Sequence, residues 1–197
     1  QKYSHQLITG VSFGLTSAVI TSLGMIVGLH SATSSKLAVV AGIVIMAIAD
    51  GLSDAVGLHL VEESETEKGR AKHTKREIWL TTIFTFLSVC GFSLTFAVPI
   101  LLFRLKTAIF IAISWGIVLL ILLNFRIAKI RKENPIRLIS EHLLLALLVI
   151  IISYWVGNLI ANGLNKMIRN LVAASRWNAS SLCSARNDGN TQRSHAI

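Results

Sequence analysis

Five long apolar runs set the strongest limit on what this chain can fold into. Each is close to the length of about 20 residues that crosses the hydrocarbon core of a bilayer. Backbone polar groups find no water there, so such runs are expected to be α-helices. Only 15% of the residues are charged, against about 25% in soluble domains. The sequence therefore predicts an all-α, polytopic membrane protein with five transmembrane helices. The runs are Leu7–Leu29, Leu37–Val61, Ile78–Phe103, Ala108–Phe125 and Leu138–Leu164.

The basic residues between these runs predict how the chain crosses the bilayer. The net charge is +9, which in a soluble protein would suggest a nucleic-acid partner. Here Lys and Arg concentrate in short connecting segments, so we interpret them as topology signals and expect no nucleic-acid partner. The richer side, which includes the N-terminus, is expected to be cytoplasmic, and an odd number of spans then places the C-terminus on the other side. The richer side holds Lys2, Lys68, Arg70, Lys72, Lys75, Arg76, Arg126, Lys129, Arg131, Lys132 and Arg137.

The end of the chain differs in composition from the rest. Residues 1–165 form the predicted five-helix transmembrane domain. Residues 166–197 are polar, and from about Ser175 they are rich in Ser, Asn, Arg and Gly. This composition is typical of a disordered tail.

The second run carries two carboxylates where a membrane helix would be apolar. Met46, Asp50 and Asp54 are spaced at i, i+4 and i+8, which places them on one stripe of a helix, about 12 Å long. Each Asp near the bilayer centre costs about 2.5–3.5 kcal/mol on insertion scales. We interpret the pair as cation ligands and proton acceptors, with Met46 as a softer thioether ligand that favours Fe²⁺ or Mn²⁺. The alternative is two protonated carboxyl groups that hydrogen-bond neighbouring helices.

Small residues predict where helices approach closely. Ala47, Gly51 and Ala55 form a stripe beside the aspartates, on which another helix can pack. The pairs Gly10/Gly14 and Gly24/Gly28 each make a G-x-x-x-G pattern in the first run, which predicts close helix contact, such as one across a dimer.

Acidic residues follow the second run at its expected cytoplasmic end. Glu62, Glu63 and Glu65 begin a charged link that extends to Glu77, and they predict an acidic mouth that concentrates divalent cations. Glu141 lies near the start of the fifth run, on the same side of the membrane. It could converge with Asp54 as a ligand or stabilise the dipole of its own helix.

These features now allow a comparison with a known family. The chain resembles the vacuolar iron transporter (VIT) family of Fe²⁺/Mn²⁺ transporters. The resemblance covers most of residues 7–165. It is carried by "ITGVSFGLTSAVITSLGMIVGL", "VAGIVIMAIADGLSDAVGLHLVEESE", "GFSLTFAVPILLF" and "NPIRLISEHLLLALLVIIISYWVGNLI".

The resemblance implies a five-helix protomer that forms a homodimer with a cytoplasmic N-terminus. Family members move Fe²⁺ or Mn²⁺ out of the cytosol, into a vacuole or across the cell membrane, in exchange for protons. This chain departs from the family pattern, because Phe13 replaces an Asp, and Met46 and Asp54 stand where members carry Glu and Met. The Glu-rich domain of many members, between the second and third spans, has no counterpart in the short link Glu62–Glu77.

Two classes of function follow from these observations. The first is a proton-coupled exporter of divalent metal in a vacuolar or plasma membrane, in which Met46, Asp50, Asp54, Glu62, Glu63, Glu65 and Glu141 contact the transported ion and no resident cofactor is needed. The second is a non-transporting relative that serves as a membrane scaffold or partner-binding subunit. An enzyme is not expected, because the chain has no H-E-x-x-H and no G-x-S-x-G motif.

Overall fold

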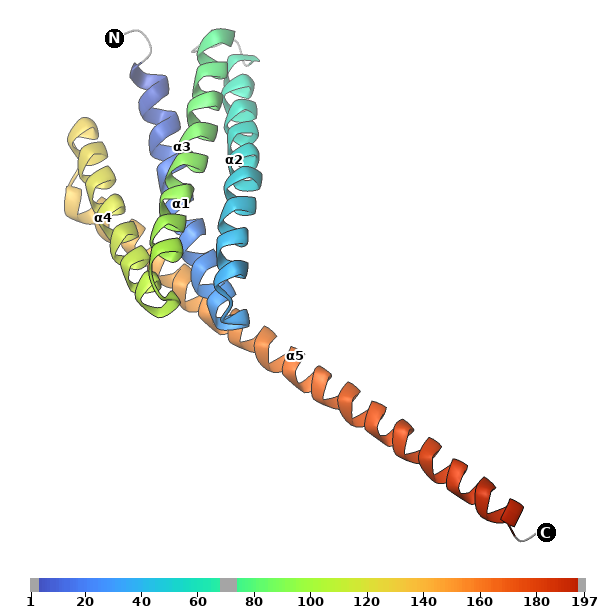
Figure 1. Ribbon diagram of the computed structural model, residues 1–197. Coiled ribbons are helices and arrows are strands. Elements are labelled where there is room, and N and C mark those ends of the chain that lie inside the picture. Colours follow the sequence, from blue (N-terminus) through green and yellow to red (C-terminus); the bar gives the residue numbers. More distant parts are fainter. Residues whose placement is uncertain (1–3, 68–73, 195–197) are drawn as a thin grey trace. The chain divides into compact units, whose positions relative to one another are not determined.

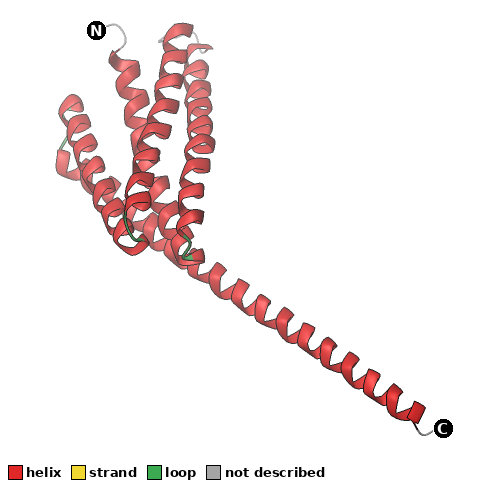
Figure 2. Ribbon diagram, viewed as in Figure 1, coloured by secondary structure: helices red, strands yellow, loops and turns green. Residues whose placement is uncertain are grey.

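Helices form almost all of the described chain. The computed structural model describes residues 4–67 and 74–194, and within these ranges it contains no strand (Figure 2). The helices are α1 (Ser4–Thr33), α2 (Lys36–Glu67), α3 (Lys75–Leu102), α4 (Leu105–Arg131) and α5 (Pro135–Ser194) (Figure 1). Each contains a segment long and apolar enough to cross a bilayer. The predicted all-α membrane class is therefore confirmed.

The helices extend beyond the apolar runs that predict them. α2 continues past Val61 to Glu67, and α4 continues past Phe125 to Arg131. The acidic residues of the predicted link thus belong to the last turns of α2, and the predicted basic link 126–137 is wrong for most of its length. Hydropathy marks the part of a helix suited to lipid, whereas Glu, Lys and Arg are themselves good helix formers and let the helix continue into water.

The C-terminal tail is part of the fifth helix in the structure, and its predicted disorder stays a prediction. The chain divides into two compact units, Gln1–Gly157 and Asn158–Ile197. The second unit is the continuation of α5, which is described as helix through Ser194. No proline follows Pro135, and Ala, Leu, Met and Arg residues between 161 and 186 favour a helix. A polar composition therefore did not end the helix where the sequence predicted.

Local signals explain where three of the helices begin or end. The Glu77 carboxylate accepts a hydrogen bond from the Thr74 N–H at 2.8 Å, an N-terminal capping contact that starts α3. Lys132 ends α4 in the left-handed conformation, at φ 57°. Asn134 then caps α5, because its Oδ1 accepts the Ile136 N–H at 3.0 Å and Pro135 supplies the fixed φ of a first helical residue.

α1 and α3 lie at the centre of the first unit. α3 packs against α1, α2 and α4, and α1 also contacts α2 and α4 (Figure 1). The largest buried side chains in this core are Leu23, Ile26, Ile43, Phe96, Ile100 and Leu120. Many other apolar side chains are exposed, including Phe110 on α4 at 74%. Such exposure suits a surface that faces lipid rather than water.

Glycines bring the backbones of α1 and α3 into contact. A Cβ atom on Gly14 would lie 2.7 Å from the Ser88 Cβ and 2.9 Å from the Thr85 carbonyl oxygen. Gly10 faces the Thr81 carbonyl oxygen in the same way, at 2.9 Å. The G-x-x-x-G pattern therefore predicted a close contact correctly, and this contact lies within one chain.

A lysine caps the end of α3 from the neighbouring helix. Pro99 lies inside α3 and has no N–H, yet the helix continues to Leu102. The Lys36 Nζ atom donates hydrogen bonds to the carbonyl oxygens of Leu101 at 2.8 Å and Phe103 at 3.2 Å. This cation satisfies terminal carbonyl groups that have no partner within their own helix.

Candidate functional site

The two aspartates of α2 lie on a half-buried face of the helix. Asp50 and Asp54 are both intermediate in exposure, and Met46 on the same stripe is buried. Asp50 is close enough to Asp54 to act on it electrostatically. The Oδ2 atom of each aspartate is buried and has no hydrogen-bond partner among the described residues. Two buried acceptor atoms on one face are thus available to a cation or to protons.

A hydroxyl group from α1 reaches this pair. The Ser17 side chain lies close enough to the Asp54 carboxyl group to interact with it. The neighbouring hydroxyls are used differently, because Thr21 and Thr16 donate to the backbone oxygens of Ser17 and Ser12 at 2.8 and 2.9 Å. Ser17 was missed from sequence, although the recurrence of Ser and Thr within an apolar run was a visible signal. It adds a third oxygen-bearing side chain to the site.

The small-residue stripe of α2 holds the aspartate-bearing helix against α3. Ala47, Gly51 and Ala55 are all buried. The Cys90 thiol of α3 donates a hydrogen bond to the Ala47 carbonyl oxygen at 3.1 Å. A Cβ atom on Gly51 would lie 3.1 Å from the Cys90 Sγ atom. These contacts confirm the predicted packing face.

Phe13 lies beside a pocket formed by three helices of the first unit. The pocket has a volume of about 590 Å³ and is lined from α1, α4 and α5. The Phe13 side chain is 45% exposed, and no carboxylate lines this pocket. The pocket's titratable side chain is His142, whose Nδ1 atom lies 2.9 Å from the Leu138 carbonyl oxygen. The lining residues are Ile8, Thr9, Ser12, Phe13, Thr16, Ile127, Ile130 and His142.

The predicted acidic mouth lies within α2 rather than in a loop. Glu62 is half-buried and Glu63 is exposed, both in helical conformation. Glu65 is also in the helix, but its side chain lies outside the described residues. The structure places these acids in the turns that follow Asp54, and their role as metal contacts stays a prediction.

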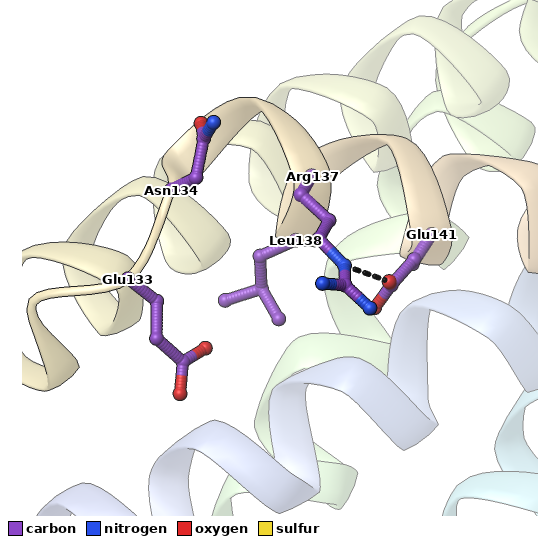
Figure 3. A pocket seen from close by; sticks show the side chains of 5 residues that line it. All are labelled: Glu133, Asn134, Arg137, Leu138 and Glu141. Carbon is purple, nitrogen blue, oxygen red and sulfur yellow. Dashed lines mark hydrogen bonds and ion pairs between the residues drawn. The ribbon is translucent and has the colours of Figure 1, made fainter.

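Glu141 occupies a different environment from either predicted one. It accepts a hydrogen bond from the Arg137 Nε atom at 3.0 Å (Figure 3). Both side chains line a pocket of about 380 Å³ with Glu133, Asn134 and Leu138. The helix-dipole interpretation is wrong, because α5 begins at Pro135 and has no acidic residue in its first turn. The described partner of Glu141 is Arg137 rather than Asp54.

The described residues of one chain do not form a complete metal site. Over residues 4–67 and 74–194, no three His, Cys, Asp or Glu side chains are close enough to hold one metal ion. Asp50 and Asp54, with Ser17, therefore offer a partial set of oxygen ligands. A bound cation would take its remaining ligands from water or from a second chain.

Comparison with known proteins adds one distant relative. The chain is 28% identical over 142 residues to "Uncharacterized protein MJ0645" of Methanocaldococcus jannaschii, which corresponds to 62% of this chain and 74% of that protein. No family model matches the sequence, and no solved structure gives a significant match.

Proposed function

We propose that this protein is a transmembrane transporter of divalent metal ions, with Fe²⁺ or Mn²⁺ as cargo and protons as the exchanged ion. The single observation that carries the proposal is the pair of buried, unpartnered Oδ2 atoms of Asp50 and Asp54 on one half-buried face of α2. Two acidic groups inside an apolar span are costly unless a cation or protons compensate them. A divalent ion compensates both at once, and two protons restore neutrality when it leaves.

The surroundings of the pair support a hard, partly hydrated ion. Carboxylate and hydroxyl oxygens are ligands suited to Mn²⁺ and similar cations, and a thioether such as Met46 adds a preference for softer transition ions. The resemblance to the VIT family supports the same cargo and a homodimer. Further acids follow at Glu62 and Glu63, at the end of α2 that the charge pattern places in the cytoplasm.

A transport assay in reconstituted vesicles tests the proposal. Purified protein in proteoliposomes is given Mn²⁺ or Fe²⁺ outside and a pH gradient across the membrane. We expect gradient-dependent metal uptake that is lost in the Asp50→Asn/Asp54→Asn double variant. Glu133→Gln is the matched control, since this exposed acid lies at the α4–α5 turn, and it should leave uptake unchanged. No metal uptake by the wild type, or full uptake by the double variant, contradicts the proposal.

A second function is favoured by a different observation. The described residues of one chain gather no three-ligand group, and Phe13 stands where the family resemblance would place a carboxylate. Both features suit a membrane scaffold or partner-binding subunit that no longer transports. In that case the double variant leaves the metal tolerance of cells unchanged, whereas a transporter loses its protective effect.

A further inference from the structure

A histidine near the end of α2 is held in place by its neighbours on α3. The His59 Nδ1 atom lies 2.9 Å from the Thr82 Oγ1 atom. The Thr82 hydroxyl already donates its hydrogen to the Ile78 carbonyl oxygen at 2.9 Å. A hydroxyl has a single hydrogen, so when Thr82 donates to Ile78 it accepts the bond from His59. In that arrangement Nδ1 carries the imidazole hydrogen, and the lone pair of Nε2 is open to a ligand.

The His59 ring also packs against an aromatic side chain of α3. The His59 ring centroid lies 4.9 Å from that of Trp79, with the two planes inclined at 63°. A histidine that binds a metal ion through one nitrogen almost always donates its other N–H to a fixed acceptor, which sets the ring orientation. Thr82 and Trp79 provide this arrangement for Nε2.

A carboxylate lies one helical turn beyond His59. Glu63 follows His59 by four residues in α2, and side chains at i and i+4 are neighbours on a helix surface. The Glu63 side chain is exposed, whereas His59 is half-buried. Residues 7–29 of α1 contain no ionisable side chain. The positive charges of Lys75 and Arg76 lie at the start of α3.

We propose that His59 Nε2 and Glu63 form an entry site for a divalent transition-metal ion at the end of α2. The inference rests on the proposed function and names the first protein ligands that the transported ion meets. Two side chains hold the ion and water completes its coordination, which agrees with the lack of a three-residue group in the described chain. An imidazole ligand favours Fe²⁺ or Co²⁺ over Mg²⁺ and Ca²⁺, which prefer oxygen alone.

Trp79 allows binding to be measured without transport. Paramagnetic Co²⁺ quenches the fluorescence of a nearby indole, whereas diamagnetic Mg²⁺ does not. Detergent-solubilised full-length protein is titrated with Co²⁺ and, separately, with Mg²⁺. We expect saturable quenching by Co²⁺ that is insensitive to a tenfold excess of Mg²⁺. Trp79→Phe should remove the quenching, because it removes the reporter indole.

Two variants then assign the ligands. His59→Asn keeps an N–H donor for Thr82 but loses the Nε2 ligand, and Glu63→Gln changes an exposed side chain with little risk to folding. Each should weaken Co²⁺ binding roughly tenfold or more. His142→Asn, at a histidine of α5, should leave binding unchanged.

The outcomes separate this site from the proposed function. Unaltered Co²⁺ binding in His59→Asn or in Glu63→Gln overturns the entry site, as does the absence of saturable quenching in the wild type. The vesicle assay with the Asp50/Asp54 double variant decides the transport proposal independently of either result. Saturable binding that needs both His59 and Glu63 supports the entry site even where no flux is found.

Discussion

The hydroxyl group of Ser17 on α1 lies close enough to the carboxyl group of Asp54 on α2 to interact with it. This proximity brings the polar group of each helix next to a polar group of the other, within otherwise apolar spans. The buried Oδ2 atom of Asp54 has no hydrogen-bond partner in the described chain. Ser17 is therefore a positioning residue for the proposed cation site.

Replacing Ser17 tests this relationship directly. Ser17→Ala removes the hydroxyl group beside Asp54, and a hydrogen bond to an ionisable group contributes about 1.5–3 kcal/mol. If this hydroxyl orients Asp54 for metal, the KM for Mn²⁺ uptake should rise roughly tenfold while the folded protein remains intact. Ser12→Ala is the control, because Ser12 lines the pocket beside Phe13. Equal uptake by both variants would show that Ser17 has no part in binding.

Gly14 is predicted to be essential for the α1–α3 contact. Gly14→Leu places side-chain atoms where Ser88 and Thr85 already lie, and overpacking of this kind costs about 1–3 kcal/mol. Thermal unfolding in detergent should show a clear loss of stability. Gly91→Leu on α3 is the matched control, since nothing lies within 4 Å of a Cβ atom there. A Gly14→Leu protein as stable as the control would contradict the close backbone approach.

Lys36 is predicted to stabilise the end of α3. Lys36→Met keeps the length of the side chain but removes the donor to the Leu101 and Phe103 carbonyl oxygens. Because the lysine is exposed, we expect a modest loss of about 1 kcal/mol in the free energy of unfolding. Lys106→Met, at the start of α4, should have less effect. Hydrogen exchange of α3 amides gives a local measurement, and unchanged exchange near Phe103 would argue against the cap.

Glu141 is predicted to be dispensable for transport. Its described contact is an exposed ion pair with Arg137 on the same helix, and such i,i+4 pairs contribute about 0.3–0.5 kcal/mol. Glu141→Gln should therefore change Mn²⁺ uptake less than twofold, in contrast to Asp54→Asn. A loss of uptake as large as that of Asp54→Asn would restore Glu141 to the set of metal contacts.

The sequence predicted the packing faces of α1 and α2 because the small residues that allow close helix contact recur there at helical spacing. Gly10 and Gly14 contact α3 as their spacing implied, and so does the stripe that contains Gly51. Helix ends were predicted less well, since they depend on local contacts such as the capping of α5 by Asn134. The structure starts α5 at Pro135, three residues before the predicted Leu138. Glu141 therefore lies beyond the first turn, where it pairs with Arg137.

The sequence could not predict which side chains of different helices contact one another. Ser17 meets Asp54 because α1 is rotated so that this residue faces α2, and the helical period alone does not fix the rotation of one helix against another. The same holds for His59, whose contacts with Thr82 and Trp79 depend on the register between α2 and α3.

Metal-dependent stabilisation is the most direct measurement of the central claim that Asp50 and Asp54 bind a divalent cation. It is best made in a His59→Asn background, so that the proposed entry site does not contribute. At Mn²⁺ concentrations about 100 times the dissociation constant, a bound ion stabilises the folded protein by about 2.7 kcal/mol. We expect a concentration-dependent rise in Tm with Mn²⁺ that disappears when Asp50→Asn and Asp54→Asn are added. An equal rise in the presence and absence of the two carboxylates would contradict the account.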